Sequence, residues 1–134
     1  MPLVRIDMLQ GRSALERETI AECTHRAMVD TLGVPERDRF QIVTEHAPGA
    51  FHFDRAYLDI ERTDAFVLVC VTLASGRSTE VKQAFYARLC ELLVAEAALR
   101  PQDLAVSLVE SEREDWSFGN GQASHLTIPK DRWR

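Results

Sequence analysis

The tripeptide Gly-Arg-Ser occurs twice in the chain, at residues 11–13 and again at residues 76–78. A strand-like segment precedes each copy: residues 2–9 largely alternate between apolar and polar side chains, and residues 65–73 form a continuous apolar run. Alternation predicts a half-buried strand, whereas a continuous β-branched run predicts a strand that is covered on both faces. The repetition therefore predicts two related units, each of which begins with a strand and a turn.

A helix is expected after each Gly-Arg-Ser sequence. Ser13 and Glu16 match a capping box, in which each side chain satisfies a backbone N–H that the helix start leaves unpaired. Gly33 is placed to end the first helix. Both segments are predicted to be amphipathic helices because apolar residues recur on one face. These residues are Ile20, Cys23, Ala27, Met28 and Leu32 in the first helix, and Val81, Phe85, Leu89, Leu92 and Leu93 in the second.

A second strand is expected after each helix, at residues 39–45 and 104–109. Each of these strands follows a proline and an aspartate, namely Pro35 and Asp38 in the first unit and Pro101 and Asp103 in the second. Residues 50–63 lie between the units and show no clear period, so they are expected to form a loop that could include a short strand. The order is thus strand, helix, strand, twice over.

A strand–helix–strand unit crosses over with a right hand and places its two strands parallel. We therefore expect an α/β (α+β) fold in which a tandem β-α-β repeat forms a four-stranded mixed sheet with two helices on one face. The uncovered face has to be buried on something, and oligomerisation is the simple answer. We expect one domain over residues 1–134, with units at about 2–46 and 65–110 and a C-terminal hairpin and tail at 111–134.

Composition and charge exclude several functional classes. The net charge is −5 with both signs interspersed, and no basic stripe of the kind that binds nucleic acid occurs. No apolar run approaches the ~20 residues of a membrane span, and the first residues lack the pattern of a signal peptide, so we expect a cytoplasmic protein. The three cysteines are far apart, which indicates free thiols. The histidines lack metal-ligand spacing, and neither a metal nor a cofactor is expected.

Pro2 gives the N-terminus a chemical property that no internal residue has. A small residue after the initiator normally allows removal of Met1, which would expose the secondary amine of Pro2. The strand behind Pro2 would hold that amine in a fixed place, whereas most termini fray. Two interpretations stay open from these residues alone: a catalytic amine, or Met-Pro as a common way to begin a protein.

The motifs together resemble the tautomerase superfamily, and within it the malonate semialdehyde decarboxylase-like branch. The likeness covers roughly residues 2–121, and its motifs are Pro2-Leu3, Ala27-Met28-Val29-Asp30, Val34-Pro35, Asp38-Arg39-Phe40-Gln41, Arg77-Ser78 and Asp115-Trp116-Ser117-Phe118-Gly119. Members of this superfamily use an amino-terminal proline, and members with two fused units assemble into trimers. The resemblance therefore implies a homotrimer that acts on a small carboxylate substrate.

The resemblance also implies roles for particular residues. Pro2 would be the catalytic amine, and Asp38 would be an acidic partner that stabilises the ammonium form and helps to orient the substrate. Arg77 would bind the substrate carboxylate through two parallel hydrogen bonds. Trp116 and Phe118 would form an aromatic wall. From sequence alone, Asp38 could equally be a turn residue, Arg77 a solvated loop arginine, and the two aromatic residues part of the core.

Two further positions carry less weight, and one departs from the family pattern. Gln41 and Tyr57 are weaker site candidates. Ser75 is expected to be a substrate-binding residue; it stands where the best-known decarboxylase pattern has a second arginine, so the resemblance leaves the identity of the substrate open. If Met1 stays in place, the nitrogen of Pro2 is an amide and the amine mechanism fails.

Three functions remain open at this point. The first is an enzyme that decarboxylates a short 3-oxo acid such as malonate semialdehyde through Pro2. The second is a keto–enol tautomerase, or a hydratase of the haloacrylate type, at the same site. A neutral proline would favour tautomerisation, and a cationic one decarboxylation or hydration. The third is a non-catalytic ligand-binding trimer.

Overall fold

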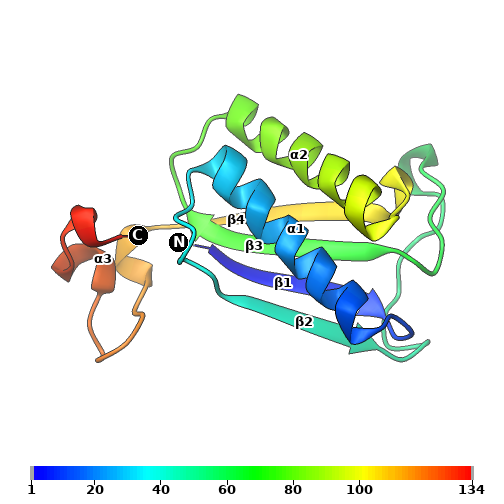
Figure 1. Cartoon of the computed structure of the whole chain (residues 1–134), viewed down its shortest axis with the longest axis horizontal. Coiled ribbons are helices and arrows are strands. Elements are labelled where there is room, and N and C mark those ends of the chain that lie inside the picture. The colour runs from blue at the N-terminus through cyan, green and yellow to red at the C-terminus, as the bar shows by residue number, and fades with distance from the viewer. Residues whose placement is uncertain (1, 134) are drawn as a thin grey trace.

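The computed structural model describes residues 2–133 and contains two similar halves (Figure 1). The first half consists of β1 (Pro2–Leu9), α1 (Ala14–Leu32) and β2 (Gln41–His46). The second consists of β3 (Val67–Ala74), α2 (Thr79–Ala97) and β4 (Leu104–Ser111). The two long helices and the first strand of each half have matching lengths, as the repeat predicted.

The four strands form one sheet in the order β2-β1-β3-β4. Strands β1 and β2 are parallel, as are β3 and β4, whereas β1 and β3 pair antiparallel at the centre. In that central pair Pro2 lies opposite Leu73 and Met8 lies opposite Val67. The expected four-stranded mixed sheet is therefore confirmed, and the antiparallel contact places the two halves head to tail.

Both helices begin directly after a Gly-Arg-Ser sequence, as predicted, and of the capping box expected at Ser13 and Glu16 the serine half is confirmed. The hydroxyl of Ser13 accepts a hydrogen bond from the backbone N–H of Glu16 at 3.2 Å, and that of Ser78 accepts one from Val81 at 3.3 Å. Helix α1 ends at Gly33, whose φ of 68° lies in the left-handed region that glycine adopts without strain. Helix α2 ends in the same conformation at Ala98, where φ is 51°.

The hydrophobic core lies between the sheet and the two helices, which cover the same face (Figure 1). Alternate residues of β1 and β3 point into it, and the apolar face of each helix covers them; the largest fully buried side chains are Phe85, Ile6, Met8, Ile20, Met28, Leu73, Leu89 and Leu93. On the other face of the central strands, side chains such as Leu3, Leu9, Leu68 and Cys70 are only partly buried. Among residues 2–133 no helix covers that face.

Three expectations need correction or refinement. The predicted C-terminal hairpin is wrong: within residues 112–133 the chain forms short helical turns, including α3 (Ser124–Thr127), and no strand. The loop between β2 and β3 holds a 3-10 turn, Tyr57–Asp59, and no strand. The described residues include no helix that is both long and apolar enough to cross a membrane.

Candidate active site

Several chain segments meet at one end of the sheet. Strand β1 begins there, β3 and β4 end there, α1 ends nearby and α2 begins nearby (Figure 1). The C-terminal segment, residues 112–133, lies beyond this same end of the sheet. Two neighbouring cavities are formed at this end, with volumes of about 200 Å³ and about 480 Å³. They share Pro35, Asp38, His125 and Trp133 as lining residues.

Asp38 lies in the loop between α1 and β2 and lines both cavities. Its backbone N–H donates to the carbonyl of Pro35 at 3.0 Å, so the residue belongs to a tight turn. Its side chain is only 9 % exposed. Burial raises the pKa of the Asp38 carboxyl, and this is the largest effect; neighbouring ionisable groups, His125 among them, act in the opposite direction. The carboxyl therefore lies in a low-dielectric position with cationic or ionisable groups around it.

Arg77 precedes α2 and lines the larger cavity together with Ser75. Its Nε atom donates to the carbonyl of Leu32 at 3.0 Å, and its Nη1 atom donates to the carbonyl of Ala74 at 2.8 Å. Burial lowers the pKa of the guanidinium, which nevertheless remains charged because arginine is not deprotonated in proteins. A guanidinium has five N–H donors, so the two carbonyls leave donors for an anionic ligand.

The side chain of Ser75 makes a hydrogen bond within the protein. Its hydroxyl donates to Oε1 of Glu112 at 2.9 Å. It therefore ties the end of β3 to the segment that follows β4, and it supplies no positive charge to the cavity.

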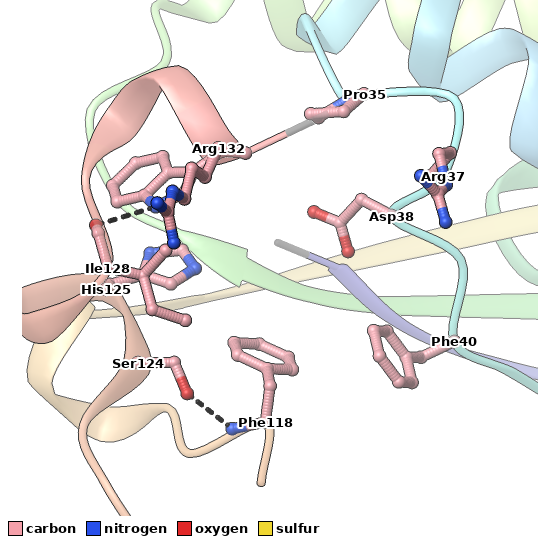
Figure 2. Close-up of a pocket in the computed structure, with 10 residues that line it drawn as sticks. Pro35, Arg37, Asp38, Phe40, Phe118, Ser124, His125, Ile128 and Arg132 are labelled. Atoms are coloured by element: carbon pink, nitrogen blue, oxygen red, sulfur yellow. Dashed lines mark hydrogen bonds between the residues drawn. The ribbon is translucent and has the colours of Figure 1, made fainter.

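The aromatic residues form a stack at the smaller cavity. Phe118 lines that cavity, and its ring centroid lies 5.4 Å from the ring of Phe40 and 5.5 Å from that of His125 (Figure 2). Trp116 stacks on Phe118 at 5.4 Å with an interplanar angle of 6°, and its Nε1 donates to Ser111 Oγ at 2.8 Å. Trp116 is not one of the described residues that line either cavity, so it supports Phe118 from behind.

Pro2 is the buried first residue of β1. It is not one of the described residues that line the cavities, but the beginning of β1 runs up to the lining side chains beside Asp38 (Figure 2). The expected removal of Met1, on which a free amine depends, concerns a residue outside the described range.

The two weaker candidates do not line this site. The amide of Gln41 donates to the carbonyl of Ala21 at 2.8 Å and accepts from Arg39 at 2.9 Å, which fixes β2 against α1. Tyr57 is 64 % exposed in the loop between β2 and β3. The side chain of Gln41 therefore has a structural contact, and that of Tyr57 is exposed outside both cavities.

The second repeat uses the same residue types differently. Asp103, the counterpart of Asp38, is fully buried and accepts hydrogen bonds from the backbone N–H and the hydroxyl of Thr63, both at 2.7 Å. Arg12, the counterpart of Arg77, donates to the carbonyl of Ala65 at 2.6 Å. At this second position the aspartate holds the loop that leads to β3.

The C-terminal segment contributes lining residues that the sequence pattern did not indicate: Arg113, Ser124, His125, Ile128, Lys130, Arg132 and Trp133. They lie on short turns without periodicity, so only their composition could have drawn attention to them. No group of three metal-ligating side chains is present among residues 2–133.

Comparisons with known proteins indicate the same family over most of the chain. Two family models described as tautomerase enzymes match, one over residues 38–119 and the other over residues 2–54. The probable tautomerases YusQ and YrdN of Bacillus subtilis (strain 168) are 36 % and 39 % identical. The alignments cover 94 % and 95 % of this chain and 99 % and 98 % of those proteins.

Solved structures of related proteins are similar to this chain over nearly its full length. A malonate semialdehyde decarboxylase, studied for its decarboxylase and hydratase activities, is 38 % identical with a TM-score of 0.88, over 93 % of this chain and 96 % of that one. The FG41 malonate semialdehyde decarboxylase inhibited by 3-bromopropiolate is 37 % identical with a TM-score of 0.88, over 93 % and 95 % of the two chains. A fused 4-OT described as a symmetric trimer is 23 % identical with a TM-score of 0.76, over 93 % and 98 %, and shares the fold.

Proposed function

The chain belongs to the tautomerase superfamily of enzymes, and we propose that within it the protein decarboxylates a short 3-oxo acid such as malonate semialdehyde, with Pro2 as the catalytic amine. The observation that supports this most strongly is that Asp38 and Arg77 line one cavity at the end of the sheet where β1 begins. Similarity to two malonate semialdehyde decarboxylases over most of the chain supports the choice of reaction. The non-catalytic interpretation is set aside because the superfamily is one of enzymes.

The proposed mechanism begins with the substrate carboxylate on Arg77. The donors of Arg77 that are not bound to carbonyls grip the carboxylate, while the ammonium of Pro2, stabilised by Asp38, donates a hydrogen bond to the aldehyde oxygen. The carbon–carbon bond breaks, its electron pair moves into the developing enolate, and carbon dioxide leaves. The enolate carbon then takes up a proton from water, and acetaldehyde is released.

The aromatic side of the smaller cavity assists the loss of carbon dioxide in this proposal. Phe118 and Phe40 present apolar surface there, and Trp116 keeps Phe118 in place. The two cavities share Asp38 and His125, so in this proposal a carboxylate on Arg77 lies where the larger cavity adjoins this apolar surface. There it loses part of its hydration, whereas neutral carbon dioxide does not need it. Trp116 thus acts as a positioning residue behind Phe118, which itself faces the substrate.

A tautomerase or hydratase reaction at the same site is the second candidate. The curated relatives are named probable tautomerases, and the decarboxylase at 38 % identity is also described as having hydratase activity. If Pro2 is neutral at neutral pH, it acts as a base that moves a proton from carbon to carbon. The charge state of Pro2 is therefore what separates the two candidates.

We also propose that the protein forms a homotrimer. The face of the sheet opposite the helices carries partly buried apolar side chains, including Leu3, Leu9, Leu68 and Cys70, which another chain could cover. Sedimentation equilibrium is expected to give three times the 15.2 kDa of the chain. A monomeric mass at micromolar concentration would contradict this proposal.

The function is tested by proton NMR of malonate semialdehyde incubated with wild-type protein and with Pro2→Ala. Mass spectrometry first establishes whether Met1 has been removed from both proteins. Acetaldehyde formed by the wild type and lost in the variant is the expected result. If the wild type shows no turnover although Met1 is absent, decarboxylation of this substrate is refuted, and ketonisation of a simple enol acid is then the reaction to measure.

A further inference from the structure

His125 is a polar side chain on an otherwise largely aromatic and aliphatic side of the smaller cavity. It lies on the short helix α3 and lines both cavities. Its ring lies 5.5 Å from that of Phe118 and is stacked on that of Trp133 at 4.4 Å. Figure 2 shows the ring across the smaller cavity from Asp38. Aromatic contacts therefore fix the orientation of an imidazole at the site.

The hydrogen-bonding capacity of this imidazole is unused within the described chain. The Nδ1 atom is buried and has no hydrogen-bond partner among residues 2–133. The Nδ1 atom of His25 is likewise buried with no partner among residues 2–133, but the Nε2 atom of that ring lies 2.8 Å from the carbonyl oxygen of Glu36, and His25 lines neither cavity. A buried polar atom without a partner loses the hydrogen bonds that it would make with water, and this destabilises the folded protein. Such an atom requires an explanation, and a ligand in the cavity provides one.

The charge state of the ring follows from its surroundings. Burial lowers the pKa of His125 and is the largest effect; the positive charge of Arg113 also lowers it, and Asp38 acts in the opposite direction. The ring is therefore neutral at neutral pH. A neutral imidazole has one N–H donor and one acceptor nitrogen, and it can bind a substrate oxygen without placing another full charge in the cavity.

We propose that His125 is an additional catalytic residue, one whose ring N–H donates a hydrogen bond to the carbonyl oxygen of the substrate; the inference rests on the function proposed above. In the decarboxylation, the electron pair of the broken carbon–carbon bond moves toward this oxygen. A donor held in place before the reaction stabilises that charge with no cost of reorientation. His125 keeps its proton, and the enolate carbon still takes its proton from water.

The first test compares the steady-state kinetics of three variants. His125→Phe keeps an aromatic ring against Phe118 and Trp133 but removes both nitrogens, and we expect kcat to fall about 10²-fold, with a smaller change in KM. His125→Gln restores part of kcat because its amide can donate. His52→Phe is the matched control at an exposed histidine outside both cavities, and wild-type kinetics are expected.

If His125→Phe retains wild-type kcat while Pro2→Ala is inactive, the role of His125 is refuted and the proposed function stands. If the wild type itself does not turn over malonate semialdehyde, the proposed function has failed instead. A second measurement then decides on His125, and it also applies if a variant does not fold.

This second measurement is the ¹⁵N chemical shift of the histidine rings in wild-type protein titrated with 3-hydroxypropanoate. This compound keeps the carboxylate and an oxygen at the position of the aldehyde but cannot decarboxylate. A change at the His125 nitrogens without a change at His52 supports the inference. The inference is overturned if the chemical shift of the Trp116 indole changes until the site is saturated while the shifts of the His125 nitrogens stay the same. It is also overturned if 3-hydroxypropanoate does not bind.

Discussion

Arg77→Ala removes a side chain that we assign to two tasks. In the structure, Arg77 binds the carbonyls of Leu32 and Ala74, which joins the end of α1 to the end of β3. In the proposed mechanism the same guanidinium holds the carboxylate that leaves. The substitution should therefore reduce both stability and substrate affinity, and the two losses can be measured separately.

The structure sets the size of each loss. A hydrogen bond from a charged group contributes roughly 1.5–3 kcal/mol when it is well formed. Arg77 is only half-buried, and water can replace it at the two carbonyls, so we expect the free energy of unfolding to fall by roughly 2 kcal/mol. Loss of one charge-assisted grip on the carboxylate should raise KM by roughly 10- to 100-fold. The effect on kcat should be smaller, since the carboxylate charge disappears as carbon dioxide forms.

Arg12→Ala is the matched control. Arg12 occupies the same place in the first Gly-Arg-Ser sequence and donates to the carbonyl of Ala65, away from both cavities. Denaturant unfolding at one fixed protein concentration and steady-state decarboxylation are measured for both variants. We expect a loss of stability in both and a raised KM only for Arg77→Ala. An Arg77→Ala protein with the KM and kcat of Arg12→Ala would show that Arg77 is a structural residue and refute the reasoning.

Further predictions concern the two aspartates and the end of α2. Because burial raises the folded-state pKa of Asp38, its ionised form opposes folding at neutral pH; the stabilising contribution is present at low pH and is lost as pH rises through the folded pKa. Asp38→Asn should therefore unfold at higher denaturant concentration at pH 7 while losing about 10²-fold in kcat/KM, and unchanged activity would exclude its proposed role. Asp103→Asn should do the opposite, lowering the unfolding midpoint because the contacts with Thr63 are weakened, with kcat/KM preserved. Ala98→Gly should raise stability by about 0.5–1 kcal/mol, because a left-handed alanine is strained, whereas Gly33→Ala should lower it; equal midpoints for both variants would contradict this explanation.

The sequence was sufficient for the fold because its signals are local and occur twice. The caps at Ser13 and Ser78, the apolar period of the helices and the alternation of β1 all follow from neighbouring residues. The continuous apolar run of β3 predicts a strand but not which of its side chains face the helices. The antiparallel contact between β1 and β3 does not follow from either repeat alone. It depends on how the two halves pair with each other, which neighbouring residues do not determine.

The candidate site could be predicted only in part. Asp38, Arg77, Ser75 and Phe118 do line the two cavities, although their catalytic roles remain predictions. Trp116 was expected to line the substrate site. It lies behind Phe118 instead, because its indole N–H donates a hydrogen bond to the hydroxyl of Ser111. The sequence did not indicate that residues 122–133 line the cavities. The positions of these turns depend on long-range contacts, and their sequence has no periodic pattern that would predict them.

The duplicated architecture has a consequence for how many reactive amines one molecule can have. A linear chain has two equivalent strand beginnings, at Pro2 and Val67, but only one amino terminus. The nitrogen of Val67 is a peptide amide in the middle of the chain, and no side-chain substitution can turn it into an amine. Fusing two units into one polypeptide thus fixes the stoichiometry at one terminal amine for every two units. A circularly permuted chain opened in the loop before β3 would move that amine to the opposite end of the sheet, where Asp103 and Arg12 are already occupied with structural contacts.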